Sequence, residues 1–235
     1  MAPRIERPVW RMFDAIAPRY DLLNRLLSFG QDLKWRRVLA DSVSDADRIL
    51  DIATGTGDAL MALADRRAGG RFCVGVDMAG EMLKLAHRKL TRKGENAVCA
   101  LARCDAEAIP FADASFDAAT IAFGIRNVAD VPKTLREMHR VLKPGGRLAV
   151  LEFAIPSQRI VRTLYLLYFR HVLPLLGGLV SRDCHAYKYL NRSVEAFPYG
   201  KAFCDVVSAG GFYNVTARPL TCGIASLYLG KKVRG

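Results

Sequence analysis

The chain has 235 residues, of which 51% are hydrophobic and 25% charged, and its formal net charge is +12. This length suits one large domain, or one domain with an elaborated cap, and the apolar content is enough to bury a full core. The six cysteines include no C-x-x-C pair and have no partners at zinc spacing, which favours ordinary reduced thiols over a metal site.

Neither the first residues nor the most apolar stretch has the pattern of a membrane-directed segment. The first ten residues, MAPRIERPVW, are charged and lack the apolar core of a secretory signal. Residues 164–180 contain Arg170, His171 and Pro174, which makes this stretch a poor membrane span. We therefore expect a cytoplasmic protein.

The positive charge is unevenly distributed along the chain. Residues 41–155 carry 16 basic and 16 acidic side chains, so the whole excess lies in the flanking segments. Such flanks favour an anionic partner, either nucleic acid or lipid headgroups. A basic surface that only keeps the protein soluble explains the same charge equally well.

The predicted elements begin with residues 8–43, where aromatic and aliphatic side chains recur in a helical pattern. From residue 48 onward, short apolar runs alternate with helical patterns. The predicted strands are 48–53, 71–77, 98–104, 116–124 and 147–153, and the predicted helices between them are 57–67, 80–92 and 131–142. The last of these helices ends at the stop signal Lys143-Pro144-Gly145-Gly146.

The remaining segments predict additions to this core. Residues 158–180 form a second apolar, helical stretch, 193–209 predict a last helix, and 213–220 and 223–230 predict a closing antiparallel strand pair. Strands interleaved with helices indicate an α/β fold with a mainly parallel sheet covered on both faces. We interpret 1–235 as a single domain with four parts: an N-terminal helical cap (1–45), a cofactor-binding core (46–155), an apolar substrate cap (156–192) and a closing helix and strand pair (193–235).

In such sheets, ligands bind beyond the carboxyl ends of the strands, and the loop in ILDIATGTGD lies at such an end. A phosphate-binding loop of the Gly-Lys-Ser/Thr type is excluded because Asp58 follows the last glycine. A dinucleotide loop is disfavoured because Leu60 takes the place of the third glycine and Asp58 would repel a diphosphate. S-adenosylmethionine, which carries an ammonium and a sulfonium and no phosphate, fits better.

Carboxylates follow three consecutive predicted strands. Asp51 and Asp58 flank the glycine loop and complement a positive charge directly or through water, and Asp77 ends the second strand, where it can accept hydrogen bonds from ribose hydroxyls. Asp105 follows the third strand and could accept from an adenine amino group. Tight turns and helix N-caps would explain any one of these residues without a ligand. Their common position at strand ends favours an adenosine-containing ligand.

Several motifs resemble class I S-adenosylmethionine-dependent methyltransferases, and more narrowly the ubiquinone/menaquinone biosynthesis C-methyltransferase family. The general motifs are ILDIATGTGD, VGVD, CDAEAIPFADASFDAATIAFGIRNV and RVLKPGGRLAVLEF. The narrower resemblance rests on YDLLNRLLSFGQDLKW, with Asp32 where His is common, and on RVLKPGGRLAVLEFA, which ends in Ala154 where Ser is usual. The resemblance covers about residues 10–230.

This resemblance implies a Rossmann-like, seven-stranded sheet in the order 3-2-1-4-5-7-6, with the last strand antiparallel. It implies S-adenosylmethionine as methyl donor and no metal. Ala122 stands where the family has a serine, so we expect that side-chain hydrogen bond to be absent or replaced. Together with the motif analysis, the candidate cofactor-binding residues are Asp51, Gly55, Thr56, Gly57, Asp77, Met78, Asp105, Ala106 and Ala122.

The implied reaction moves a methyl group to a ring carbon of a reduced polyprenyl quinone, so the enzyme must align the groups and stabilise a phenolate. Arg126 and Asn127 are the catalytic candidates for this task, with Tyr20 closing over the cofactor; an ion pair would be the non-catalytic role of Arg126. The further acid–base or ring-stacking candidates of the cap are His171, His185, Tyr187 and Tyr189.

The family analogy favours demethylmenaquinol as substrate, in menaquinone biosynthesis. The alternatives are the 2-methoxy-6-polyprenyl-benzoquinol of ubiquinone biosynthesis, another small molecule, a nucleic acid, or cofactor binding without turnover. A nucleic-acid substrate is disfavoured because FGIRN replaces the Asn/Asp-Pro-Pro-aromatic run of amino-methylating enzymes. We expect peripheral contact with an anionic membrane surface, which the basic flanks and the apolar cap would provide, and allow for a homo-oligomer.

Overall fold

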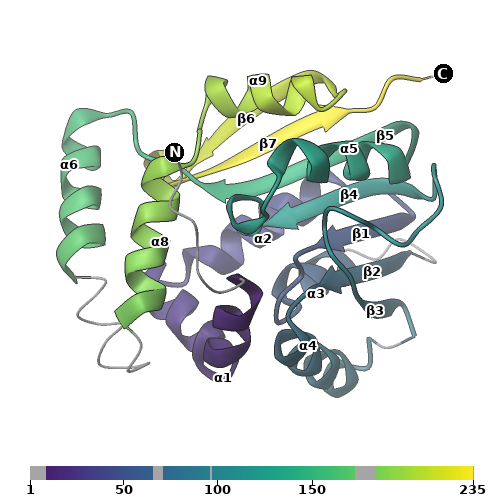
Figure 1. The fold of residues 1–235 in the computed structure, drawn as a ribbon, viewed down its shortest axis with the longest axis horizontal. Helices are drawn as coiled ribbons and strands as arrows, with labels where there is room; N and C mark the ends of the chain where they lie inside the picture. The colour runs from purple at the N-terminus through teal and green to yellow at the C-terminus, as the bar shows by residue number, and fades with distance from the viewer. Residues whose placement is uncertain (1–8, 66–70, 96, 173–183, 235) are drawn as a thin grey trace.

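The computed structural model describes residues 9–65, 71–95, 97–172 and 184–234, and it contains a seven-stranded sheet in the order β3-β2-β1-β4-β5-β7-β6 (Figure 1). The strands are β1 (Arg48–Ile52), β2 (Phe72–Asp77), β3 (Cys99–Arg103), β4 (Phe116–Ala122), β5 (Leu142–Phe153), β6 (Tyr213–Leu220) and β7 (Ala225–Lys231). The first five strands pair in parallel, and β7 is antiparallel to both β5 and β6. The expected strand order is confirmed.

Helices cover both faces of this sheet. The described helices are α1 (Val9–Leu27), α2 (Gln31–Ser42), α3 (Asp58–Ala64), α4 (Gly80–Lys93), α5 (Val131–Val141), α6 (Arg159–Leu167), α8 (Cys184–Ala196) and α9 (Lys201–Ala209), with short segments η1 (Ile125–Asn127), η2 (Tyr168–Val172) and η3 (Thr221–Gly223). None of the helices in the described ranges is both long enough and apolar enough to cross a membrane.

Successive side chains of β1 point to opposite faces of the sheet, and both faces are covered, which explains why its residues are almost all apolar. Ile49 points to one face and packs with residues of α2 and α3, whereas Leu50 and Ile52 point to the other and pack with residues of α5 and α9. All three side chains are fully buried. A strand that is covered on both faces has no solvent side, so it shows a continuous apolar run instead of an alternating one.

Some boundaries differ from the sequence prediction, and left-handed backbone explains two of the differences. The helix predicted over 8–43 is two helices, because Phe29 and Gly30 have φ values of 50° and 71° and end the first one. The helix predicted over 193–209 is likewise divided, with Gly200 at φ 59° directly before α9. Of the stretch predicted over 158–180, residues 173–180 lie outside the described residues.

The predicted stop signal 143–146 ends α5 but does not form a separate turn. It belongs to the start of β5, where the register with β4 shifts between Phe116 and Ala118. Gly145 has φ 77°, and its N–H donates to the carbonyl of Lys232 near the C-terminus. The extra residues therefore form an irregular strand start that the C-terminal segment closes.

The cap elements lie together at one end of the sheet. Helices α1, α6 and α8 stand beside the end to which the parallel strands point, at the left in Figure 1. Leu23 of α1, Tyr165 of α6 and Val194 of α8 form one small apolar cluster, together with Phe169. The cap therefore faces the edge of the sheet where the carboxyl ends of the strands meet.

Candidate functional site

A cavity of about 730 Å³ lies at the carboxyl ends of the parallel strands. Its walls come from the loops that follow β1, β2, β3 and β4 and from α1 of the cap. Strands β1 and β4 are neighbours in space although β2 and β3 lie between them in the chain, so this is the switch point of the sheet. Ligand sites of open α/β sheets form at such points.

Two residues at the floor of this cavity have unusual backbone conformations. Ala53 follows β1 with φ 50°, and Phe123 follows β4 with φ 59°. Residues other than glycine rarely adopt positive φ values, and the backbone strain that results is concentrated at ligand sites. Gly124 allows the two loops to touch, because a Cβ atom there would lie 2.6 Å from the Cβ atom of Ala53.

Asp77 holds the glycine loop against the end of β2. Its Oδ2 accepts a hydrogen bond of 2.8 Å from the N–H of Gly55, and its Oδ1 accepts one of 2.8 Å from the N–H of Ala79. Burial raises the pKa of Asp77, and the backbone N–H groups that it binds counteract the rise. Both Gly55 and Asp77 line the cavity.

Six of the nine predicted cofactor residues line this cavity: Gly55, Asp77, Met78, Asp105, Ala106 and Ala122. The other three are Asp51, Thr56 and Gly57, and their contacts are with other parts of the loop and its neighbours. The Thr56 hydroxyl donates to Asp21 of α1 at 2.6 Å. Gly57 has φ 83°, and a Cβ atom there would lie 3.0 Å from that of Ala86, so glycine lets α4 pack against the loop.

Asp51 lies beneath the loop and is fully buried. Its carboxylate accepts hydrogen bonds of 2.7 Å from the hydroxyls of both Thr54 and Thr120. Burial raises the pKa of Asp51 to about 6, although the two hydroxyls act against this rise. The expected contact of Asp51 with a positive ligand is therefore replaced by contacts that fix the end of β1.

The first turn of α3 contains the carboxylate of Asp58. Asp58 accepts from Lys89 at 2.7 Å and from Arg25 at 2.6 Å. Burial alone would raise the pKa of Asp58, but the positive charges of Lys89, Arg36 and Arg25 outweigh it and hold the pKa below its usual value. Asp58 places a negative charge at the start of α3, and the N–H of Gly55 already donates to Asp77. The described loop is therefore unsuited to binding a diphosphate.

The charges on the cavity wall suit a cation. The carboxylates of Asp77, Asp105 and Glu107 line it, and Arg126 is the single basic residue among the described lining residues. Arg126 is in turn neutralised by Glu152, to which its Nη1 donates at 2.5 Å. Such a wall favours an ammonium or sulfonium over an anion. S-adenosylmethionine carries both of these cationic groups, and the cavity fits it.

The predicted catalytic residue Arg126 forms a buried ion pair with Glu152 at the end of β5. The side chains are 5% and 1% exposed, respectively. Nη1 of Arg126 also donates to the carbonyl of Phe123 at 2.8 Å, and the guanidinium lies 5.2 Å from the ring centroid of Phe153. Burial raises the pKa of Glu152, and the charge of Arg126 opposes the rise. The ion pair considered as a non-catalytic role for Arg126 is therefore present.

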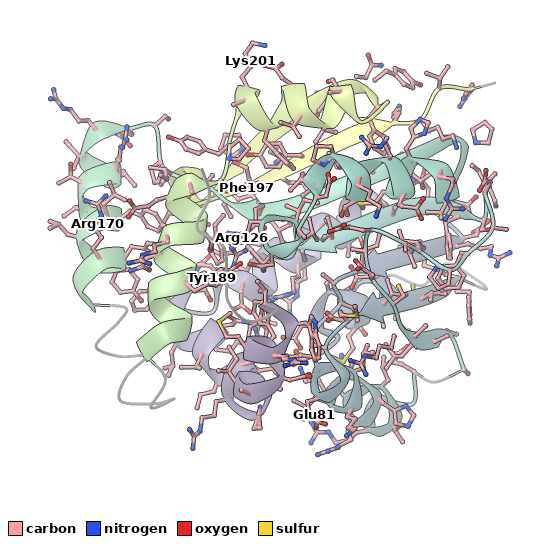
Figure 2. The ribbon with its side chains drawn as sticks, viewed as in Figure 1. Glu81, Arg126, Arg170, Tyr189, Phe197 and Lys201 are labelled. Atoms are coloured by element: carbon pink, nitrogen blue, oxygen red, sulfur yellow. The ribbon has the colours of Figure 1, made fainter. Side chains whose placement is uncertain are left out.

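Asn127 and Tyr20, the other two catalytic candidates, also line the cavity. The amide of Asn127 donates to the carbonyl of Phe123 at 3.2 Å, and its Oδ1 accepts from the hydroxyl of Tyr189 at 3.0 Å. Figure 2 shows Arg126 and Tyr189 near each other where α8 meets the strand ends. The side chains of His171, His185 and Tyr187 lie outside the described residues.

A second cavity of about 580 Å³ lies next to the first, between the cap helices. Its wall is mainly aromatic and aliphatic, with contributions from α1, α2, α6 and α8. The residues that line both cavities are Phe13, Tyr20, Phe123, Arg126 and Tyr189. A group held in one cavity therefore faces a group held in the other across Arg126.

Of the three positions that depart from the family motifs, Ala122 lines the first cavity, Asp32 lines the second, and Ala154 lines neither. Asp32 lines the second cavity, where its carboxylate accepts from Ser28 at 2.8 Å and from Arg36 at 2.6 Å, and pairs with Arg25. Ala154 is buried at the end of β5, and its N–H donates to the carbonyl of Ile224. Asp32 therefore places a polar cluster in an otherwise apolar wall.

Sequence reasoning missed Glu152. The only signal was an acidic residue at the carboxyl end of the apolar run LAVLEF, the same kind of position that singled out Asp77. Tyr165, a buried residue of the second cavity, gave no signal because an aromatic residue in an apolar helix is usual in a core.

Comparisons with known proteins agree with this geometry. Residues 2–232 match the model of the ubiE/COQ5 methyltransferase family. A demethylmenaquinone methyltransferase from Thermus thermophilus is 50% identical over 223 residues, covering 94% of this chain and 100% of that protein. A protein named ubiquinone/menaquinone biosynthesis C-methyltransferase UbiE, from Geotalea uraniireducens, is 48% identical over 226 residues, covering 95% of this chain and 96% of that protein.

Among solved structures, a protein from Thermotoga maritima has a similar fold. It is described as a SAM-dependent methyltransferase, possible histamine N-methyltransferase, and the TM-score is 0.62 at 17% identity. The likeness covers 95% of this chain and 99% of that one. At this identity the similarity concerns the fold.

Proposed function

The chain belongs to the ubiE/COQ5 methyltransferase family, and on this premise we propose that it methylates a ring carbon of a reduced polyprenyl quinone, with demethylmenaquinol as the substrate. S-adenosylmethionine is the methyl donor. Its sulfonium supplies a methyl group that is already activated for transfer. The observation that carries the proposal is the pair of adjoining cavities, one acidic and one apolar, that share Arg126 in their common wall.

The cofactor would be held by the residues of the acidic cavity. Asp77 presents a carboxylate to ribose hydroxyls at the end of β2, and Asp105 presents one at the end of β3, where an adenine amino group can donate. Asp51, Thr56 and Gly57 act from behind the wall by fixing the loop.

The apolar cavity would hold the quinol, and Arg126 would act on its oxygen. A ring carbon becomes nucleophilic when the neighbouring hydroxyl loses its proton, so a cation beside that oxygen stabilises the reacting form. The guanidinium of Arg126 would serve as this cation. Tyr20 lines both cavities, and Asn127 lines the first and accepts from Tyr189 of the shared wall; both would fix the ring so that carbon, methyl and sulfur lie in line.

The decisive experiment measures methyl transfer from labelled S-adenosylmethionine to demethylmenaquinol, to the 2-methoxy-6-polyprenyl-benzoquinol and to transfer RNA in parallel. We expect label in demethylmenaquinol. Incorporation into the benzoquinol at a higher kcat/KM would assign the chain to ubiquinone biosynthesis, which the name of the Geotalea relative also covers. Labelled RNA with unlabelled quinols would reject the proposal.

An inactive control needs two substitutions. Arg126→Ala alone would leave the buried Glu152 without its counter-charge and so would destabilise the fold as well as the reaction. Arg126→Met combined with Glu152→Gln removes both charges and preserves much of the side-chain volume.

We further propose that the cap rests on an anionic membrane surface while the quinol enters. Apolar side chains are exposed around the second cavity, among them Phe29 (77%), Leu164 (63%) and Ile160 (71%). Phe29 and Leu164 also line that cavity. Arg159 and Arg162 are exposed on the same helix as Leu164 and would contact acidic headgroups.

A further inference from the structure

Two buried polar atoms that belong to residues lining the second cavity have no hydrogen-bond partner in the described part of the chain. They are Nε of Arg126 and the hydroxyl oxygen of Tyr165. They come from different elements, η1 and α6, and both residues line the same largely apolar cavity. Buried polar groups in folded proteins are almost always paired, so two unpaired ones at one cavity point to a ligand that pairs with them.

Tyr165 is held rigidly in the wall of this cavity. The side chain is buried, and its ring stacks on Phe169 with centroids 5.1 Å apart and an interplanar angle of 25°. Its ring thus has a packing role that does not need the hydroxyl. Phenylalanine would fill the same space, so the oxygen atom calls for a separate explanation.

The hydroxyl of Tyr165 lies in the electrostatic field of the catalytic ion pair. Burial raises the pKa of Tyr165, the charge of Arg126 lowers it, and that of Glu152 raises it again. Tyr165 is therefore coupled to the ion pair that lies where the two cavities meet.

We propose that the hydroxyl of Tyr165 donates a hydrogen bond to the quinol oxygen that is remote from the methylated carbon. This inference rests on the proposed function. Arg126 lines both cavities, so it faces the oxygen beside the reacting carbon, which must lie near the cofactor. Tyr165 lines only the second cavity and takes the oxygen on the other side of the ring. With both oxygens bound, the ring can present only one carbon to the methyl group.

The test compares Tyr165→Phe with the control Tyr213→Phe, since Tyr213 is exposed on β6 and lines neither cavity. Loss of one hydrogen bond to the substrate predicts that kcat/KM for demethylmenaquinol falls about ten-fold in Tyr165→Phe, chiefly through KM. The KM for S-adenosylmethionine should not change in either variant. Because the hydroxyl has no partner among the described residues, the melting temperature of ligand-free Tyr165→Phe should equal or exceed that of the wild type.

A substrate analogue supplies a second test that needs no folded variant. A prenylated naphthol that keeps the oxygen beside the reacting carbon and lacks the remote one should react about ten-fold less efficiently with the wild type. In Tyr165→Phe, the analogue and demethylmenaquinol should react equally well, because the contact is already absent.

Each result has a defined consequence. If the wild type methylates no quinol, the proposed function fails and this inference fails with it. If the wild type is active but treats the analogue and the quinol alike, only the role of Tyr165 is overturned. A melting temperature several degrees lower in Tyr165→Phe would also overturn it, since the hydroxyl would then have a partner within the protein.

Discussion

The guanidinium of Arg126 is fixed before any substrate arrives. One nitrogen donates to Glu152 and to the carbonyl of Phe123, and the plane lies close to the ring of Phe153. Such a group needs little reorganisation when negative charge develops on a nearby oxygen, which is the condition for strong electrostatic catalysis. On the proposed function, Glu152 is a positioning residue that acts through Arg126.

A double-substitution cycle tests this division of tasks. Glu152→Gln should destabilise the protein by about 3 kcal/mol, because it leaves the buried charge of Arg126 without a counter-charge. Adding Arg126→Met should recover most of this loss. We expect kcat to fall about ten-fold in the single variant and at least about 100-fold in the double variant. Urea unfolding and methyl-transfer assays measure both quantities. Wild-type kcat in the double variant would exclude Arg126 from the chemistry.

Asp77 offers a prediction about the cofactor alone. Asp77→Ala removes the acceptor for the N–H groups of Gly55 and Ala79 and the carboxylate that we propose binds the ribose. The Kd for S-adenosylhomocysteine should rise about 100-fold, and about ten-fold in Asp77→Asn, which keeps one acceptor oxygen. The kcat at saturating cofactor should change much less than in the Arg126 variants. Calorimetry gives the affinities. Unchanged affinity in Asp77→Ala would show that Asp77 shapes the loop only.

The raised pKa of Asp51 predicts a pH-dependent stability. The pKa is about 6 in the folded protein against an ordinary 3.8. Between these pH values the folded state keeps a proton that the unfolded state has lost. The free energy of unfolding therefore falls as pH rises through this window, by up to about 3 kcal/mol from Asp51.

Asp51→Asn should remove this contribution, since an amide can still pair with the hydroxyls of Thr54 and Thr120. Relative to the wild type, the variant should gain stability between pH 4 and pH 7. Denaturant unfolding at both pH values measures the gain, with the exposed Asp47→Asn as control. Equal pH dependence in wild type and Asp51→Asn would contradict the assignment.

At the residue scale, the sequence predicted which loops line the first cavity better than it predicted the contacts of individual side chains. Position after a strand predicts which residues reach the ligand edge, and Asp77 and Asp105 follow this rule. It does not predict which side of a loop a side chain takes. Asp51 is the last residue but one of β1, so it points into the core and not toward the cavity. Glu152 was missed because its partner Arg126 is 26 residues away in the chain.

At the scale of elements, helix α1 is attached to the neighbouring loops and helices by an apolar cluster around Ala17, Ala79 and Met82 and by several charged groups. The carboxylate of Asp14 accepts a hydrogen bond from the N–H of Glu81 in the first turn of α4. Asp21 accepts one from the hydroxyl of Thr56 and forms an ion pair with Lys89. Arg25 donates to Asp58 at 2.6 Å. Because α1 carries Tyr20 and Phe13 into the shared wall, we expect these contacts to affect the affinity for the cofactor.

Lys89→Met should loosen this attachment, since it removes the cation that joins Asp21 to Asp58. We expect the KM for S-adenosylmethionine to rise several-fold. Raising the salt concentration should weaken cofactor binding less in the variant than in the wild type. Lys84→Met is the matched control, because Lys84 lies on the same helix with 64% of its side chain exposed. Equal KM values for Lys89→Met and Lys84→Met would argue against the attachment.

The predictability of the elements follows from their burial. The first five strands were predicted well, apart from the irregular start of β5, because a sheet covered on both faces leaves continuous apolar runs. The division of residues 8–43 into two helices was not predicted, because the residue type of Phe29 does not indicate its left-handed backbone. The position of β7 between β5 and β6 came only from the family resemblance, since strand order depends on long-range pairing.

At the scale of the whole molecule, the proposed membrane contact predicts binding to anionic vesicles at low salt that weakens as salt is added. Phe29→Ser combined with Leu164→Ser should lower the partition coefficient about ten-fold, because two exposed apolar side chains are lost from the cavity rim. Val233→Ser, a residue 60% exposed near the C-terminus, is the control. Vesicle cosedimentation measures the partition. No binding at low salt would refute the proposal.

The two cavities are built from different parts of the chain and share only five side chains. Helix α6 lines only the second cavity, whereas α1 and α8 also bring Tyr20 and Tyr189 to the first. On the proposed function, exchanging α6 for that of a relative should therefore change which acceptor is methylated and leave the affinity for S-adenosylmethionine unchanged.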